Sequence, residues 1–180
     1  MDVVWEPTGR LVTGPRVNTL TLETERLLLR GFSQDDLRDV IDWDDDKHGH
    51  AAETDAQEFL DFCFRQYERP GIGPCGMFFK EIGKMVGNCG YIALQNFCGE
   101  VNYFVASQHR GRGFAPEALG ALLNFGFTDL GLLRIQARCE PDNLSSERVM
   151  QKIGMKLNQP SLRISANEES RAEKIYAILR

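Results

Sequence analysis

The most informative segment of this chain reads Val105-Ala-Ser-Gln-His-Arg110-Gly111-Arg112-Gly113-Phe-Ala115-Pro-Glu-Ala-Leu119. A predicted strand over residues 100–106 leads into this glycine-bearing turn, and a predicted helix follows at once. Gly111 and Gly113 let the backbone turn tightly and bring its N–H groups close to a ligand. The first turn of a helix offers unpaired N–H donors and the positive end of the helix dipole, and Arg110 and Arg112 add positive charge. The segment therefore predicts a site for a pyrophosphate group.

This segment does not fit two common nucleotide-binding motifs. A P-loop requires Gly-Lys-Ser/Thr after its loop, and a dinucleotide fingerprint requires a third glycine where Pro116 stands. The remaining pattern, Arg110-x-x-Gly113-x-Ala115, resembles the coenzyme-A pyrophosphate signature of the GNAT superfamily of N-acetyltransferases. The same signature also fits one register earlier, from Gln108 to Gly113. We prefer the later register because it leaves the usual spacing after the strand. A basic turn without a ligand is the alternative.

Three further segments resemble one branch of that superfamily, the RimJ and RimL ribosomal-protein N-terminal acetyltransferases. The first, residues 143–154, predicts a short amphipathic helix with Asp142 or Asn143 as its N-cap. It is similar to the Asn-x-x-Ser…Lys-x-Gly-Phe segment of the branch. Thr24-Glu-Arg-Leu27-Leu-Leu-Arg30 resembles the branch's first strand, and Lys174-Ile-Tyr176-Ala-Ile178-Leu-Arg resembles its last. In this order the matches cover residues 24–180.

Composition restricts the class of protein further. At 180 residues and 42% hydrophobic, the chain suits one domain, residues 20–180, after an N-terminal extension of residues 1–19. A net charge of −5 and a pI of about 5.3 argue against a nucleic-acid partner. The five cysteines include no C-x-x-C pair, so they predict reduced thiols in a cytoplasmic protein. The chain does not open with a leader-like segment, and it contains no apolar run of the ~20 residues that span a bilayer. We therefore expect no membrane association. The acidic run of residues 44–50 lacks fixed ligand spacing, so we interpret it as exposed loop and expect no metal.

The periodicity of the chain predicts an α/β (α+β) fold. The resemblance implies a GNAT-like mixed, mostly antiparallel sheet of about seven strands with a splayed parallel pair, flanked by about four helices. Strands are expected at residues 20–30, 75–80, 84–94, 100–106, 133–139, 155–157 and 174–179. Helices are expected at residues 33–43, at 54–69 behind a capping box of Thr54 and Gln57, at about 114–130, and at 143–152.

The resemblance also implies where the cofactor lies. In GNAT folds coenzyme A enters the gap between the strand before the pyrophosphate turn and the strand after the long helix. Where two parallel strands separate, their backbone groups lose partners, and the amides of a pantetheine arm can replace them. The residues then expected beside the pantetheine and thioester are Tyr103, Phe104 and Val105, with Asn143 on the far side of the arm. Those expected around the pyrophosphate are Arg110, Gly111, Arg112, Gly113, Phe114, Ala115 and Pro116.

Acetyl transfer to an amine requires a base, donors for the oxyanion and a proton for the leaving thiolate. Many family members supply that proton from a Tyr seven residues after the Asn, and here Met150 stands at that position. We therefore predict Ser146 as the acid, or as a hydrogen-bond donor to the thiolate, with Asn143 beside it. A first-turn serine bonded to backbone is the alternative. Glu100 and Glu140 are the candidate bases, and exposed surface carboxylates are the alternative for both.

The leading hypothesis for function is transfer of an acetyl group from acetyl-CoA to a protein N-terminal amine, as the resemblance implies. The same chemistry on a small amine, such as a polyamine, amino acid or antibiotic, is a second hypothesis. A coenzyme-A-binding module without catalysis is a third, because Met150 cannot donate a proton. The sequence leaves open whether the protein is a monomer or a homodimer.

Overall fold

The computed structural model describes residues 3–5, 11–13, 20–43, 50–67, 73–164 and 170–180. The first half of the chain contains β1 (Val3–Trp5), β2 (Leu11–Thr13), β3 (Thr21–Glu23), β4 (Leu27–Gly31), a 3-10 turn (Gln34–Asp36), α1 (Leu37–Asp42), α2 (His50–Tyr67), β5 (Pro74–Phe79) and β6 (Lys84–Gln95). The second half contains β7 (Cys98–Val105), a second 3-10 turn (Ser107–His109), α3 (Phe114–Thr128), β8 (Arg134–Cys139), α4 (Leu144–Lys152), β9 (Lys156–Ile164) and β10 (Ser170–Leu179).

Eight strands form one sheet in the order β3-β4-β5-β6-β7-β8-β10-β9, and β1 and β2 form a separate two-stranded sheet. Every pair in the large sheet is antiparallel except β7 and β8, which run parallel. The predicted mixed sheet with one parallel pair is confirmed, with eight strands in place of about seven. Four α-helices are present in the described residues, as expected.

The parallel pair separates soon after it forms. Its register contains only Cys98 with Arg134, Gly99 with Ile135 and Glu100 with Gln136, after which β7 and β8 both continue without a shared partner. The backbone groups on the facing edges beyond residue 100 therefore lack each other as hydrogen-bonding partners. This opening in the middle of the sheet is where the resemblance expects a coenzyme-A arm.

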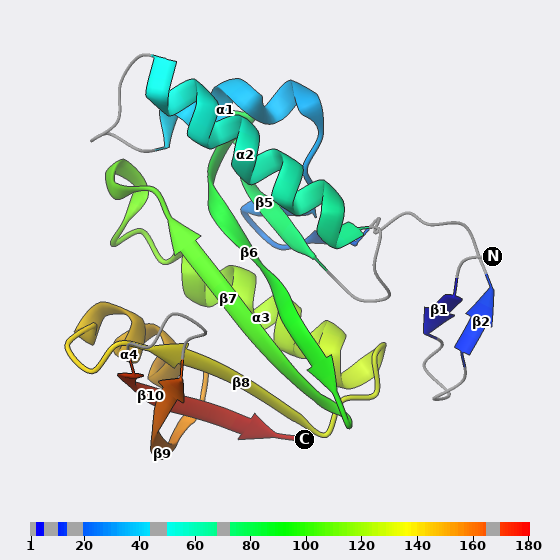
Figure 1. Cartoon of the computed structure of the whole chain (residues 1–180), viewed down its shortest axis with the longest axis vertical. Helices are drawn as coiled ribbons and strands as arrows, with labels where there is room; N and C mark the ends of the chain where they lie inside the picture. The colour runs from blue at the N-terminus through cyan, green and yellow to red at the C-terminus, as the bar shows by residue number, and fades with distance from the viewer. Residues whose placement is uncertain (1–2, 6–10, 14–19, 44–49, 68–72, 165–169) are drawn as a thin grey trace.

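Helices cover both faces of the sheet (Figure 1). The α1 and α2 helices lie over β5 and β6 on one face, and α3 crosses the other face behind β6 and β7. A larger core packs between the sheet and α3, and a smaller core packs under α1 and α2. Among the described residues, no helix combines the length and apolar character needed to span a membrane. All five cysteines carry free thiols, as predicted.

Two of the predicted elements near the N-terminus are wrong. The single strand expected at residues 20–30 is a hairpin of β3 and β4, because Thr24 closes a tight turn. The backbone N–H of Thr24 donates to the Leu27 carbonyl at 2.9 Å, and the Leu27 N–H donates to the Thr24 hydroxyl at 2.8 Å. The expected capping box at Thr54 does not begin a helix either, since α2 already begins at His50. Residues 44–49 of the acidic run lie outside the described residues.

The last two strands are longer than predicted. Strand β9 ends at Ile164 instead of residue 157, and β10 begins at Ser170 instead of residue 174. The two strands pair in antiparallel register over most of this added length, from Ser170 with Ile164 onward. Backbone pairing between adjacent strands does not require alternating apolar residues, so the polar composition of residues 158–173 concealed it.

Candidate active site

The turn between β7 and α3 has the conformation expected of a pyrophosphate-binding turn. Gly111 has φ +75° and Gly113 has φ +81°, both in the left-handed region that residues with a Cβ rarely adopt. Gly113 is the N-cap of α3, so the unpaired N–H groups of the first helical turn begin directly after it. Arg110 stands beside them, with its Nε donating to the Val105 carbonyl at 3.0 Å. We call residues 110–116 the phosphate cradle.

A cavity of about 620 Å³ runs from the phosphate cradle along the end of β7, between that strand and α4. Its size lies within the range of ordinary small-molecule sites. The lining residues come from β7, the turn, the first turn of α3 and α4; they are Tyr103, Phe104, Val105, His109, Arg110, Gly111, Gly113, Phe114, Ala115, Pro116, Asn143, Ser145, Ser146, Arg148, Val149 and Lys152. Every residue predicted for the cofactor is among them except Arg112.

Five of these lining residues were not predicted from the sequence: His109, Ser145, Arg148, Val149 and Lys152. Four of them lie on α4, where side chains three or four positions apart occupy one face. The helical spacing of these four residues around the predicted site residue Ser146 could have indicated that they line the same site. Arg148 and Lys152 are exposed and bring positive charge to the wall opposite Arg110.

Arg112 lies outside this cavity lining. Its guanidinium group lies over the rings of Phe79 and Phe114, 5.1 Å and 5.0 Å from their centroids. Its backbone carbonyl accepts a hydrogen bond of 3.0 Å from Nη1 of Arg26. Contact of Arg112 with a pyrophosphate group stays a prediction.

Arg26 belongs to a polar cluster that holds the start of α3 against the β3–β4 turn. The Glu117 carboxylate accepts from the Thr24 hydroxyl at 2.5 Å, from the Arg26 backbone N–H at 2.8 Å and from the Arg26 Nε at 2.7 Å. Partial burial by itself raises the pKa of Glu117, but these hydrogen bonds outweigh it and the pKa lies below its usual value. We call Thr24, Arg26 and Glu117 the Glu117 clamp. The sequence pattern predicted a strand at Thr24 and Arg26, and Glu117 was not among the predicted site residues.

On the other side of the cavity, Asn143 caps α4. Its side-chain oxygen accepts from the Ser146 N–H at 3.0 Å and from the Ser145 hydroxyl at 2.8 Å. The cap leaves the amide NH2 of Asn143 as the group that can donate toward the cavity. Ser146 also lines the cavity, whereas Met150 is fully buried in the main core. The position at which the resemblance expects a catalytic Tyr is therefore filled by an apolar core side chain.

Tyr103 connects the two walls. It projects from β7 beyond the point at which β7 and β8 part, and its hydroxyl donates to the backbone carbonyl of Ser146 on α4 at 3.0 Å. Burial raises the pKa of Tyr103, so its hydroxyl stays protonated at neutral pH.

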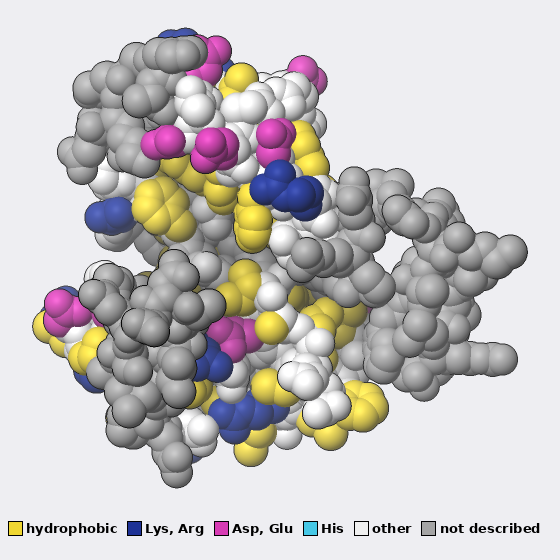
Figure 2. Space-filling model, in the orientation of Figure 1, with side chains coloured by type: hydrophobic (Ala, Val, Ile, Leu, Met, Phe, Trp, Pro, Cys, Tyr) yellow, Lys and Arg dark blue, Asp and Glu magenta, His cyan; other side chains and the backbone are white. Residues whose placement is uncertain are grey.

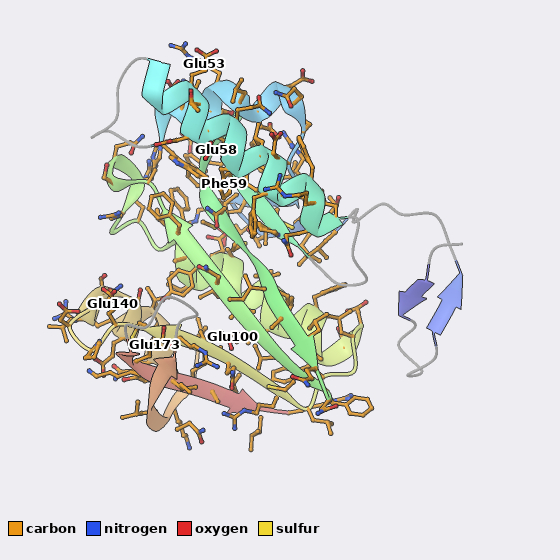
Figure 3. The ribbon with its side chains drawn as sticks, in the orientation of Figure 1. Glu53, Glu58, Phe59, Glu100, Glu140 and Glu173 are labelled. Carbon is orange, nitrogen blue, oxygen red and sulfur yellow. The ribbon has the colours of Figure 1, made fainter. Side chains whose placement is uncertain are left out.

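The two predicted bases lie away from the cavity lining. Glu100 pairs with Arg138 Nε at 2.9 Å and accepts from Gln136 Nε2 at 2.8 Å, on the strands at the apex of the opening. Glu140 is exposed after the end of β8. Figure 3 shows Glu100 and Glu173 on the β8–β10 side, opposite Glu58 on α2. A catalytic role for Glu100 or Glu140 stays a prediction.

Between these two sides the molecule is hollowed, as Figure 2 shows between α2 and β8, with acidic side chains over α2 along the rim. Aromatic rings connect Phe104, a residue of the cavity lining, to the α1–α2 layer. The ring of Trp43 lies 5.4 Å from that of Phe104 and 5.0 Å from that of Phe59, measured between centroids. Phe104 thus contacts both the cavity and the α1–α2 layer.

The sequence of the chain matches the family description "Acetyltransferase (GNAT) domain" over residues 26–156. It is 34% identical over 141 residues to an uncharacterized N-acetyltransferase, p20, of Bacillus licheniformis, covering 72% of this chain and 79% of that protein. An acetyltransferase of the GNAT family from Bacillus anthracis has a structure that matches with a TM-score of 0.73 at 26% identity, covering 89% of this chain and 98% of the other. A Vibrio cholerae protein, provisionally assigned as a ribosomal-protein-serine acetyltransferase, matches with a TM-score of 0.80 at 20% identity, covering 91% and 99%.

A sheet that opens between two parallel strands above a glycine cradle, together with these matches, defines an acetyltransferase. The chain belongs to the GNAT family.

Proposed function

We propose that this protein transfers an acetyl group from acetyl-CoA to the N-terminal amine of a protein. The observation that carries the proposal is one continuous cavity, which runs from the phosphate cradle along Val105, Phe104 and Tyr103, the part of β7 that no longer pairs with β8. A diphosphate at the cradle and a pantetheine arm in the opening would use both the left-handed glycine turn and the unpaired strand edges. The cations of Arg110, Arg148 and Lys152 around that cavity suit the charge of such a ligand.

The chemistry proceeds by direct attack of a neutral amine on the thioester carbonyl. The backbone near Val105 offers N–H donors to the oxyanion, and we propose that Asn143, the N-cap of α4, contacts the arm. The nitrogen–carbon bond forms, the carbon–sulfur bond breaks, and the sulfur takes the electron pair and then a proton. The acceptor ammonium loses its proton to a carboxylate, Glu100 or Glu140 in the sequence-based prediction, or to water. Ser146, at the cavity wall, is the sequence-based candidate for protonating the sulfur.

A protein N-terminus as acceptor is supported by the ordered motifs shared with RimJ and RimL and by the provisional assignment of the Vibrio cholerae protein. The hollow between α2 and β8 gives an acceptor a route to the strand opening from the face opposite α3. The acidic side chains along its rim favour the approach of a positively charged amine.

The test is acceptor-dependent release of free thiol from acetyl-CoA. The acceptors are short peptides with an N-terminal serine or alanine, the same peptides with an acetylated N-terminus, and the small amines spermidine and lysine. We expect release with the free peptides and none above background with the blocked ones. Release with the small amines alone would overturn the N-terminal acceptor, and no release with any amine would overturn the transferase itself.

A further inference from the structure

We propose that the hydroxyl of Tyr103 donates the proton that the sulfur of coenzyme A takes up as it leaves. This inference rests on the proposed acetyl transfer and assigns Tyr103 the role that the sequence suggested for Ser146. Tyr103 comes from β7, whereas Met150, the α4 position at which the resemblance expects the acid, is buried and does not line the cavity.

The order of the lining residues along β7 puts the sulfur beside Tyr103. The diphosphate end is fixed at the phosphate cradle, which follows the C-terminal end of β7. The arm must then run back along β7 toward the apex of the opening, where the strands still pair at Glu100. Tyr103 is the innermost residue of β7 that lines the cavity, since Phe104 and Val105 lie nearer the cradle. The reacting end of the arm is the end farthest from the diphosphate, and it therefore meets Tyr103.

The hydroxyl of Tyr103 is held against Ser146, another residue of the cavity lining, in a form that can donate. It donates to the backbone carbonyl of Ser146 at 3.0 Å, and this bond fixes the ring across the opening. A phenol has one hydrogen and rotates about one bond, so the hydrogen can turn from the carbonyl to an approaching sulfur. The side chain of Met150, by contrast, is fully buried and has no proton to give.

The proton balance closes without any additional reactant. As the carbon–sulfur bond breaks, its electron pair goes to sulfur, and the Tyr103 O–H transfers its proton to that sulfur. The tyrosinate then regains a proton from solvent, equal to the one that the attacking amine has lost. The products are the amide and the free thiol of coenzyme A.

The surroundings of Tyr103 favour its protonated form. Burial raises the pKa of the phenol, and the thiol of Cys139 on β8 adds to this. The other ionisable groups that pair with Tyr103 across the sheet or line the same cavity are Cys89 on β6, His109 and Arg110 in the turn, and Arg148 and Lys152 on α4.

The first experiment compares Tyr103→Phe with the wild type, using the serine or alanine peptide that the wild type acetylates faster. We expect kcat to fall by about 100-fold, as is usual when a general acid is removed, while the Kd for acetyl-CoA stays within about threefold. Tyr176→Phe is the matched control, because the Tyr176 hydroxyl also bonds α4, through Glu147, but does not line the cavity. We expect this control to keep the wild-type kcat.

Three outcomes of this comparison would overturn the proposal: Tyr103→Phe retaining kcat within about twofold, its loss appearing in acetyl-CoA affinity instead of kcat, or an equal loss in Tyr176→Phe. Ser146→Ala keeps the backbone carbonyl that holds Tyr103, so it should lower kcat less than Tyr103→Phe does. A larger loss in Ser146→Ala would return the role of the acid to Ser146.

The second experiment replaces Tyr103 by a fluorinated tyrosine, which keeps the shape of the side chain but ionises at lower pH. If Tyr103 donates the proton, the alkaline fall of kcat moves to lower pH together with the ionisation of the phenol. A purely structural role leaves the pH profile of kcat in place, and this result would overturn the proposal. Failure of the proposed function is distinguished from this result, because it would appear in the wild type as an absence of acetyl transfer.

Discussion

Single side chains set the shape of the phosphate cradle. The Glu117 carboxylate holds the turn after β3 through Thr24 and Arg26, and Arg26 continues to the backbone carbonyl of Arg112 inside the cradle. One carboxylate in the first turn of α3 thus links the β3–β4 hairpin to the proposed ligand site. A negative charge at the N-terminus of a helix is also favourable for the helix dipole.

Replacing Glu117 by Gln tests this link. Gln keeps the size of the side chain but loses the charge that accepts from Arg26, so we expect a loss of about 2 kcal/mol in the free energy of unfolding at neutral pH. Weaker binding of acetyl-CoA should accompany it. Thermal unfolding and calorimetry measure the two effects, and an unchanged stability would contradict the account of the clamp.

The same residue predicts a dependence of stability on pH. Because the pKa of Glu117 is lower in the folded than in the unfolded chain, its contribution is complete above the ordinary value of 4.5. The contribution is lost as the pH falls through the folded pKa. We therefore expect the difference in stability between wild type and Glu117→Gln to be constant from pH 7 to pH 5 and to shrink in more acidic solution. A difference in stability that grows as the pH falls would contradict a lowered pKa for Glu117 in the folded protein.

For single residues, the backbone conformation could be predicted from the sequence better than the side-chain contacts could. The left-handed φ angles of Gly111 and Gly113 follow from the motif, because few other residues tolerate them. The placement of Arg112 over two aromatic rings and the bond from Tyr103 to Ser146 depend on residues far apart in the chain. No local pattern encodes those contacts.

Among the elements, α3 carries two glycines with opposite surroundings. Gly120 is exposed and an added Cβ would meet nothing within 4 Å. At Gly126 an added Cβ would come within 2.0 Å of the Tyr91 hydroxyl oxygen. That hydroxyl is fixed because it donates to the Leu122 carbonyl at 2.9 Å in the buried core. Gly126 therefore allows β6 and α3 to approach closely.

The same substitution should consequently have opposite effects at the two sites. Gly120→Ala removes backbone freedom from the unfolded chain, and we expect it to stabilise the protein by about 0.5–1 kcal/mol. Gly126→Ala must displace Tyr91, and we expect a loss of more than about 2 kcal/mol. Chemical denaturation of both variants measures the difference. Equal effects would contradict the described packing of α3 on β6.

Whether a segment forms a helix or a strand could be predicted from the sequence more reliably than the residues at which that helix or strand begins and ends. The helix after the cradle and the Asn143-capped helix are confirmed, because each has a strong start signal followed by helical spacing. Thr54 was misleading, since a residue suited to capping can also lie inside a helix. The hairpin turn at Thr24 was missed because its side chain bonds locally while the flanking residues keep a strand-like pattern.

For the whole molecule, the sheet consists of two halves joined at a short seam. Strands β3 to β7 form one half and β8, β10 and β9 the other, with three residue pairs between β7 and β8. A coenzyme-A arm in the opening would add contacts between the halves. The order of the elements, and hence this division, could be predicted from the family motifs. The hollow and the ring contacts around Trp43 could not, because they depend on how the α1–α2 layer lies on the sheet.

Ligand binding should therefore stabilise the entire fold. At an acetyl-CoA concentration of 100 times Kd, linkage gives about 2.7 kcal/mol, or a rise in Tm of roughly 5–10 °C for a chain of this size. Hydrogen exchange should slow most in residues 101–105, in 137–139 and at the start of α3. An unchanged Tm, or protection confined to other elements, would contradict a ligand that bridges the two halves.

The most direct test of the central claim is calorimetric titration with acetyl-CoA and with S-acetyl-pantetheine, which lacks the diphosphate. If the amides of the phosphate cradle bind the diphosphate, acetyl-CoA binds and S-acetyl-pantetheine does not. Gly111→Ala and Gly113→Ala should each weaken acetyl-CoA binding by about tenfold or more, because φ above +70° strains a residue with a Cβ. Gly120→Ala should bind as the wild type does. Equal binding of the two ligands, or undiminished binding by both cradle variants, would contradict the claim.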